Sequence, residues 1–265
     1  MISKKMLLWM IVSSFAAVLC LSCGKTERDG QNLIVSTEAT FPPYEFRSGD
    51  KIVGVDIDIM QKVAERLGKK QVEEDTCFNS VITHVLTGKA DAAASGITVT
   101  EDRSMKVAFS EPYVEACQLI LIPKGSDVTG AEMLKNKRIG VQEGTTAYDY
   151  LRENVITDKT SSLISQFPNP SLAVEAMLAG KVDVVVCDQD PARMLYANNP
   201  DELILLTEPL TRESYAIAVA KDNPSLLNTI NEVIREMKSN GELAESFRKN
   251  EALAKSMTSE TPVSK

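Results

Sequence analysis

Two successive series of short apolar runs and amphipathic stretches constrain the fold more than any other feature of the sequence. In the first series, the apolar run Leu33–Val35 precedes a helical stripe of apolar residues between Ile59 and Leu67, which Gly68 ends. A further strand pattern follows at Asp91–Ser95, after a second helical stretch. Strands that alternate with helices at this spacing predict an α/β protein whose sheets are mostly parallel and flanked by helices.

The second series begins after Pro123 and repeats this order. Just before this second series, the unbroken apolar run Gln118–Pro123 is typical of a strand buried on both faces. Further strands are expected at Arg138–Val141 and Val182–Val186, and a long amphipathic helix at Ser225–Lys238. Two similar halves of roughly 100 residues each favour two lobes, because each half can bury a sheet of its own.

The order of the strands also predicts where the chain passes between the lobes. Two hinge strands are expected, near Cys117–Leu121 and Ser214–Ala218. Lobe 1 is then discontinuous and comprises residues 31–117 plus 217–255, and lobe 2 comprises residues 118–216. The polar tail, residues 256–265, is expected to be disordered. Small ligands usually bind in clefts between domains and beyond strand carboxyl ends, which makes the cleft between the lobes the expected site.

The N-terminus reads as an export signal. Lys4 and Lys5 precede the apolar run Met6–Leu21, which is short for a membrane-spanning helix, so residues 1–22 are interpreted as a signal peptide. The end of this run resembles the lipobox of bacterial lipoproteins, which makes Cys23 the predicted lipidation site and residues 23–30 a lipidated linker. A retained anchor helix and an ordinary secreted protein are the alternatives.

Composition excludes several classes of function. The net charge of −8 disfavours binding to nucleic acid or to anionic lipid headgroups. His84 is the only histidine, so neither a histidine-based hydrolase nor a histidine metal cluster is expected. Cys77, Cys117 and Cys187 have no zinc-like spacing. Buried free thiols are favoured, although a disulfide between Cys77 and Cys117 stays open. We therefore expect no cofactor and no metal.

Four groups of motifs carry a family resemblance. They lie in a common order from about Leu33 to Arg248, which is most of the mature chain. They are Ser36–Phe46 with Gly54–Ile59, Ala90–Arg103 with Val107–Tyr113, Gly140–Thr146, and Val182–Asp188. Together they resemble the polar amino-acid family of periplasmic solute-binding proteins. The resemblance implies a two-lobed periplasmic-binding-protein fold that closes around a free L-amino acid and is not an enzyme.

The expected contacts to the backbone of an amino acid follow from its charges and agree with the resemblance. Arg103, three residues after the expected N-cap Thr100, can bind a carboxylate with two parallel hydrogen bonds. Thr145 and Thr146 precede a helix, where backbone N–H groups face an anion and the hydroxyls add donors. Asp188 is the expected partner of the ammonium. The remaining backbone and hydroxyl contacts are assigned to Ser95, Gly96 and Thr98.

Four residues are expected to select the ligand side chain. The resemblance places the rings of Phe41 and Phe78 beside it, Glu38 at its far end, and Gln142 as a further lining residue. An acid between two aromatic rings suits a cation, through ion pairing and cation–π attraction. Arginine or lysine is therefore favoured, and glutamine or histidine is the alternative.

The function expected from these features is that of an extracytoplasmic amino-acid-binding lipoprotein of an ABC importer. Such a monomer would be tethered to a membrane by its lipid and would deliver its ligand to a permease in the inner membrane. Two alternatives stay open. One is a lipoprotein that reports ligand binding to a separate receptor. The other is a dehydratase-like enzyme on the same fold, for which Glu38 is the only good candidate acid or base.

Overall fold

The structure, a computed structural model, describes residues 30–158 and 161–259. The predictions of a signal peptide and of lipidation at Cys23 fall outside these residues. From Gln31 onward the described chain belongs to one compact unit. None of the helices in the described ranges has both the length and the apolar character needed to cross a membrane.

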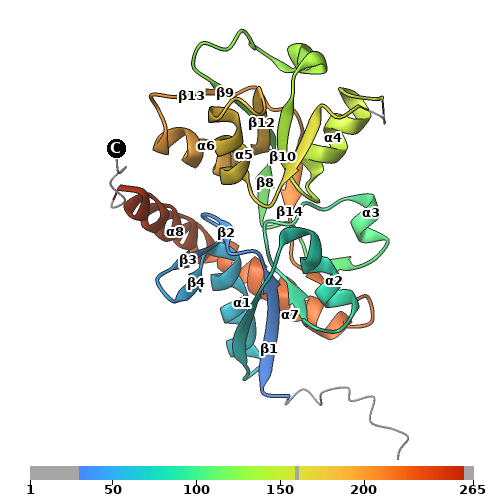
Figure 1. The fold of residues 1–265 in the computed structure, drawn as a ribbon. Helices are drawn as coiled ribbons and strands as arrows, with labels where there is room; N and C mark the ends of the chain where they lie inside the picture. The colour runs from blue at the N-terminus through green and yellow to red at the C-terminus, as the bar shows by residue number, and fades with distance from the viewer. Residues whose placement is uncertain (1–29, 159–160, 260–265) are drawn as a thin grey trace, which may run out of the picture. The chain divides into compact units, whose positions relative to one another are not determined.

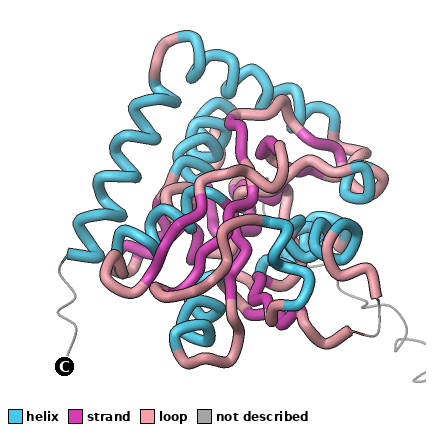
Figure 2. Tube along the Cα trace, turned by 90° about the horizontal axis from the view of Figure 1, so that it is seen from above, coloured by secondary structure: helices cyan, strands magenta, loops and turns pink. Residues whose placement is uncertain are grey.

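The first of two five-stranded sheets is built from both ends of this unit (Figures 1 and 2). Its strands, in spatial order, are β5 (Lys70–Asp75), β1 (Asn32–Thr37), β6 (Ala92–Ala93), β15 (Ala218–Val219) and β7 (Ala108–Phe109). The associated helices are α1 (Val55–Arg66), α2 (Val81–Leu86), α7 (Pro224–Ser239) and α8 (Glu242–Ser259). The short helices η1 (Phe78–Ser80) and α3 (Glu101–Ser104) lie in its loops.

The second sheet is continuous in sequence. Its spatial order is β11 (Ile164–Phe167), β10 (Ile139–Gln142), β12 (Val184–Asp188), β9 (Gln118–Pro123) and β13 (Leu203–Leu206). Its helices are the short η2 (Ala131–Asn136), α4 (Thr146–Asn154), α5 (Pro170–Leu178) and α6 (Gln189–Asn198). The predicted α/β architecture with one sheet in each half is confirmed.

Both sheets are mixed, whereas mostly parallel sheets were expected. In the first sheet β1 pairs in parallel with β5 and β6, and β15 is antiparallel to β6 and β7. In the second sheet β10 pairs in parallel with β11 and β12, and β9 is antiparallel to β12 and β13. The antiparallel strands β9 and β15 are those that the chain enters from the other half, so they do not follow the strand–helix–strand order that imposes parallel pairing.

The two chain crossings form an antiparallel ribbon of β8 (Val114–Ala116) and β14 (Glu213–Tyr215), which lies between the two sheets in Figure 1. The crossings fall close to the predicted hinge positions. The hinge strand expected near Ser214–Ala218 is in fact split, because β14 ends at Tyr215 and the next strand begins at Ala218. The chain changes from the ribbon to the first sheet between these two residues.

A small antiparallel sheet, β2 (Thr40–Phe41), β3 (Glu45–Ser48) and β4 (Lys51–Val53), was not predicted. It leads into α1 through Gly54, which has a φ of +143°. A Cβ atom at this position would lie 1.9 Å from the carbonyl oxygen of Tyr44. Only glycine fits there, so Gly54 brings α1 into close contact with the segment that carries Tyr44 and Glu45.

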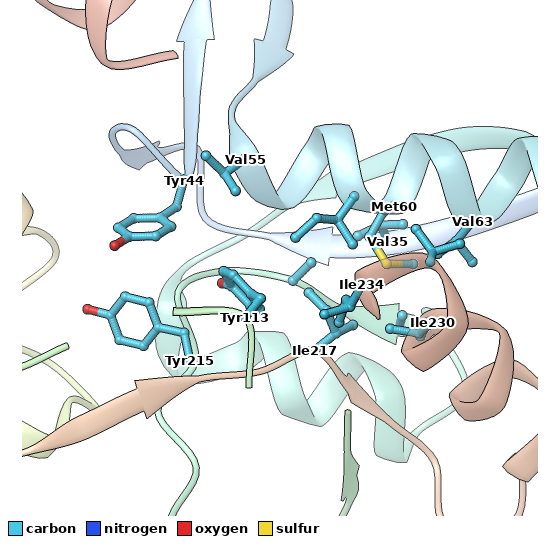
Figure 3. Packing of buried hydrophobic residues seen from close by; sticks show 14 of the residues in the cluster. Val35, Tyr44, Val55, Met60, Val63, Tyr113, Tyr215, Ile217, Ile230 and Ile234 are labelled. Atoms are coloured by element: carbon cyan, nitrogen blue, oxygen red, sulfur yellow. The ribbon is translucent and has the colours of Figure 1, made fainter. Parts of the chain in front are cut away.

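The core of the first half lies between the sheet and helices α1 and α7 (Figure 3). Val35, Met60 and Ile230 are fully inaccessible to solvent. Each such side chain contributes about 1.5–3 kcal/mol through burial. The rings of Tyr44 and Tyr215 meet edge to face with centroids 5.1 Å apart, and their hydroxyls point away from this core.

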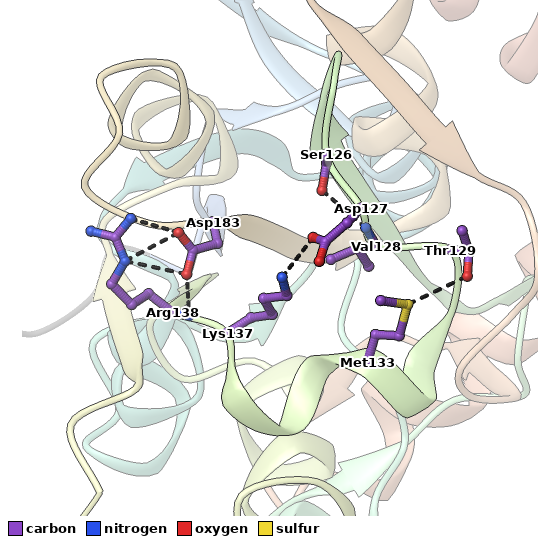
Figure 4. Close-up of polar contacts among 8 residues, drawn as sticks. All are labelled: Ser126, Asp127, Val128, Thr129, Met133, Lys137, Arg138 and Asp183. Atoms are coloured by element: carbon purple, nitrogen blue, oxygen red, sulfur yellow. Dashed lines mark hydrogen bonds and ion pairs between the residues drawn. The ribbon is translucent and has the colours of Figure 1, made fainter.

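In the second half, β9 is buried on both faces as its apolar sequence predicted. The chain that follows β9 is held by Lys137, whose Nζ lies 2.6 Å from Oδ1 of Asp127, and by Arg138, whose backbone N–H donates to Asp183 at 2.7 Å (Figure 4). Arg138 and Asp183 immediately precede β10 and β12. Their contact therefore aligns the amino ends of the two strands whose carboxyl ends carry Gln142 and Asp188.

The C-terminal prediction was partly wrong. Helix α8 continues to Ser259, four residues into the tail that was expected to be disordered. The rest of the tail, from Glu260 onward, falls outside the described residues. Along the buried side of α8, Ser246 and Asn250 lie between Leu243 and Ala254. Both polar side chains bind Asp58 of α1, at 2.6 and 2.9 Å, so polar contacts as well as apolar ones fix this helix.

Candidate functional site

Polar residues gather where parallel strands of both sheets end. Gln142 and Asp188 are the last residues of β10 and β12. Glu38 follows the end of β1, and Ser95 follows the end of β6. This is the edge at which α/β sheets present ligand-binding groups.

Nine of the eleven predicted site residues line one pocket, which measures about 230 Å³ including the part open to solvent. They are Phe41, Phe78, Gly96, Thr98, Arg103, Gln142, Thr145, Thr146 and Asp188. The structure therefore brings together residues that lie up to 147 positions apart in the chain. Glu38 and Ser95 lie behind the pocket wall.

Arg103 is fixed at the pocket by local hydrogen bonds. Its backbone N–H donates to Oγ1 of Thr100 at 3.2 Å, so Thr100 is the N-cap that the sequence predicted. Its guanidinium donates to the carbonyl oxygen of Thr98 at 2.8 Å and to that of Gly144 at 3.0 Å. The ring of Phe78 lies 5.5 Å from its Cζ. Because a guanidinium has five N–H donors, others stay available to an anion.

Asp188 is the acid that lines the pocket, and only 6% of its surface is exposed. The hydroxyl of Tyr215 donates a hydrogen bond to its Oδ1. Burial, together with the nearby charge of Glu213, raises the pKa of Asp188 to about 7. A cationic ligand group beside Asp188 would act against both effects and lower the pKa of Asp188.

Three hydroxyl groups of the pocket donate to acceptors within the protein, although donation to a ligand was expected for the helix-terminal pair. Thr98 and Thr146 both donate to Oε2 of Glu213, at 2.7 and 2.9 Å. Thr145 donates to the carbonyl oxygen of Gln142 at 2.8 Å. A hydroxyl has one proton to give, so in this arrangement these side chains can only accept from a ligand.

Glu38 and Gln142 form a linked pair at one end of the pocket. Nε2 of Gln142 lies 3.3 Å from Oε2 of Glu38 and 3.1 Å from the carbonyl oxygen of Pro168. The hydroxyl of Thr40 donates to the other carboxylate oxygen of Glu38. Burial raises the pKa of Glu38 to about 7, although the hydrogen bonds from Thr40 and Gln142 lower it. Glu38 thus reaches the pocket only through Gln142.

Ser95 lies behind the pocket wall, whereas Gly96 lines the pocket. The Ser95 hydroxyl donates to Glu45 at 3.0 Å, and the Gly96 N–H donates to Asp56 at 3.0 Å. Both groups thus have partners within the protein, whereas the sequence-based hypothesis assigned ligand contacts to these two residues. Gly96 has a φ of +50°, and a Cβ atom there would lie 2.7 Å from the ring of Phe41. The glycine therefore lets the ring approach the loop closely.

Several residues of the site were not predicted. Asp190 accepts from the hydroxyl of Tyr44 at 2.6 Å and so joins the two halves beside the pocket. Glu45 and Asp56 are buried acids below the Ser95–Gly96 turn. Both lie inside the motifs that carried the family resemblance, which is the signal that could have identified them. Glu213 has no motif around it that would have drawn attention to it.

We expect the ligand-free protein to become more stable as the pH falls from 8 to 6. Burial raises the pKa values of Glu38, Asp56 and Asp188 to about 7, whereas such groups titrate near 4 when unfolded. Between these values the folded state binds protons that the unfolded state does not. Its stability is therefore greatest at the lower pH and is lost as the pH rises through 7.

The melting temperature at pH 8, 7 and 6 measures this effect. The rise towards pH 6 should be smaller in Asp56→Asn, which has one buried titrating acid fewer, and unchanged in Glu115→Gln, which removes an exposed acid. A melting temperature that falls between pH 8 and pH 6 would contradict the assignment of these buried acids.

Comparison with known proteins assigns this chain to a family. Residues 33–250 match the model of the bacterial extracellular solute-binding proteins, family 3. The chain is 28% identical over 237 residues to the L-cystine-binding protein TcyJ of Escherichia coli, covering 88% of this chain and 86% of that protein. It is 31% identical over 244 residues to the ABC transporter arginine-binding protein 1 of Escherichia coli, covering 90% and 95%.

Solved structures agree with the sequence matches. A mutant of ArgBP from T. maritima superposes with a TM-score of 0.77 and 36% identity, over 84% of this chain and 96% of that one. ArgBP has also been solved in an arginine-bound form. The chain therefore belongs to the bacterial extracellular solute-binding proteins of family 3. It is a binding protein and not an enzyme.

Proposed function

We propose that this protein captures a free L-amino acid as the extracytoplasmic component of a bacterial ABC importer. The observation that carries the proposal is the placement of Arg103 and Asp188 in one pocket, one from each half of the molecule. A half-buried cation and a buried anion that line one pocket match the carboxylate and the ammonium of an amino acid. The names of the arginine-binding relatives support the same chemistry.

Capture would proceed by closure of two lobes, residues 31–117 plus 217–255 and residues 118–216. The ribbon of β8 and β14 is the natural hinge, because it contains the two chain crossings. Hydrogen bonds such as that between Arg103 and Gly144 already join the two sides of the pocket. Export by the signal peptide, lipidation of Cys23 and delivery to an inner-membrane permease belong to the same proposal.

We further propose that the ligand side chain is basic, with arginine or lysine preferred over glutamine or histidine. Of the residues that line the pocket, Arg103 is the single cation, and we assign it to the ligand's carboxylate. Glu38, acting through Gln142, leaves the other end of the pocket negative. The aromatic rings of Phe41 and Phe78 favour a cation between them.

Calorimetric titration with arginine, lysine, glutamine and histidine tests the side-chain assignment. Arginine or lysine should bind most tightly, and Glu38→Gln should reduce that preference about tenfold or more, since a hydrogen bond to a charged group contributes about 1.5–3 kcal/mol. Glu143→Gln, which removes an exposed acid one residue beyond Gln142, should leave the preference unchanged. Tightest binding to glutamine would overturn the assignment while preserving the amino-acid site.

A further inference from the structure

The carboxylate of Glu213 contacts both halves of the molecule from the crossing strand β14. Its Oε2 accepts from Thr98, in the loop after β6, at 2.7 Å and from Thr146, at the start of α4, at 2.9 Å. Nε2 of Gln118, on β9, lies 3.4 Å from the same oxygen. Its other oxygen accepts from Thr211 at 2.7 Å. Two of these partners, Thr98 and Thr146, line the pocket, whereas Glu213 does not.

These contacts fix the direction of both pocket hydroxyls. An ionised carboxylate can only accept, so each threonine must give its single proton to Glu213. Gln118 supports this direction at Thr146, because its Nε2 donates to the Thr146 hydroxyl oxygen at 3.2 Å. The lone pairs that remain on Thr98 and Thr146 are acceptors. They suit the ammonium of a ligand and have no proton to offer its carboxylate.

We propose that Glu213 is a positioning residue of the amino-acid site, which turns Thr98 and Thr146 into acceptors for the ligand's α-ammonium group. This inference rests on the proposed function. Asp188, which lines the same pocket, would share the ammonium with these hydroxyls, and Arg103 would hold the carboxylate. Glu213 thereby determines which end of the amino acid the threonines recognise, without touching the ligand itself.

The direction of the hydroxyls distinguishes this role from a competing one. If Glu213 merely occupied the threonines in place of the ligand's carboxylate, its removal would free two donors and tighten binding. If it orients them as acceptors, its removal weakens binding, and the loss depends on the α-amino group. Both threonines donate to Oε2, so an amide N–H₂ that takes the place of this oxygen in Glu213→Gln donates to both of them and leaves their own protons free.

The test compares two ligands that differ only in the α-amino group: L-arginine and 5-guanidinopentanoate. In Glu213→Gln we expect L-arginine to bind about tenfold more weakly than in the wild type, while the affinity for 5-guanidinopentanoate changes less than threefold, in line with a typical charge-assisted hydrogen bond. Glu115→Gln is the matched control, because it removes an exposed acid from the paired strand β8. It should change neither affinity.

Thr98→Val provides a second variant that does not depend on the folding of Glu213→Gln. It removes the acceptor while keeping the shape, so it should also weaken L-arginine selectively. Tighter binding of L-arginine in Glu213→Gln, or equal losses for both ligands, overturns the inference. If the wild-type protein binds neither L-arginine nor any other L-amino acid, the proposed function itself fails, which is a different outcome from an altered dependence on the amino group.

Discussion

Replacing Arg103 with alanine is expected to weaken amino-acid binding by about 30-fold to several thousand-fold. Removing one partner of a buried, hydrogen-bonded charge pair costs about 2–5 kcal/mol, since the other charge is left without a partner. Arg103 is the single cation among the residues that line the pocket. The ligand's carboxylate would therefore face the charge of Asp188 with nothing to offset it. Calorimetric titration of variant and wild type measures the loss.

A second variant separates charge from shape at this position, and a distant variant serves as its control. Arg103→Lys keeps the cation but cannot form two parallel hydrogen bonds, so it should bind with an intermediate affinity. Arg248→Ala removes an exposed arginine that pairs with Glu245 on α8 and should bind like the wild type. If Arg103→Ala binds within about threefold of the wild type, a difference of less than 1 kcal/mol, Arg103 does not bind the ligand's carboxylate.

Replacing Asp188 with asparagine should cause a loss of similar size and should also abolish a pH dependence. Because burial and Glu213 raise the pKa of Asp188 to about 7, the free protein must release a proton before it can pair with an ammonium at lower pH. Wild-type affinity should thus fall as the pH drops below 7, by up to about tenfold per pH unit. Asp188→Asn should bind weakly, with a flatter profile.

The stability of the ligand-free variant provides the control for misfolding. Asparagine removes a buried charge, so the melting temperature of Asp188→Asn at pH 8 should not fall below that of the wild type. Asp201→Asn, at a fully exposed position, should keep the wild-type affinity and pH profile. An Asp188→Asn protein that binds L-arginine as tightly as the wild type at every pH would rule out Asp188 as the ammonium partner.

Sequence reasoning succeeded where a local pattern determines geometry. The N-cap at Thr100 places Arg103 on a short helix, and the buried apolar runs before Gln142 and Asp188 predict strands that end within two residues of them. Because strand carboxyl ends converge at one edge of a sheet, the amino-acid sequence alone allows such residues to be grouped into one site. Most of the proposed pocket follows from this rule and from the family resemblance.

The remainder depends on contacts between distant segments. Nothing near Ser95 indicates that its hydroxyl turns towards Glu45, 50 residues away, and nothing near Glu213 indicates that it takes the protons of Thr98 and Thr146. Helix α8 was missed for a related reason. Its buried side includes Ser246 and Asn250, whose partner Asp58 lies on α1, so the apolar periodicity that signals a helix is interrupted.

The central claim, that one pocket holds both charged groups of a free amino acid, is tested most directly by a single titration. The protein is unfolded and refolded to remove any ligand carried through purification, and L-arginine is then titrated into it by calorimetry. The structure predicts one binding event per molecule, with micromolar or tighter affinity, because several charge-assisted hydrogen bonds form at once. Titrations without heat for L-arginine, L-lysine, L-glutamine and L-histidine alike would contradict the claim.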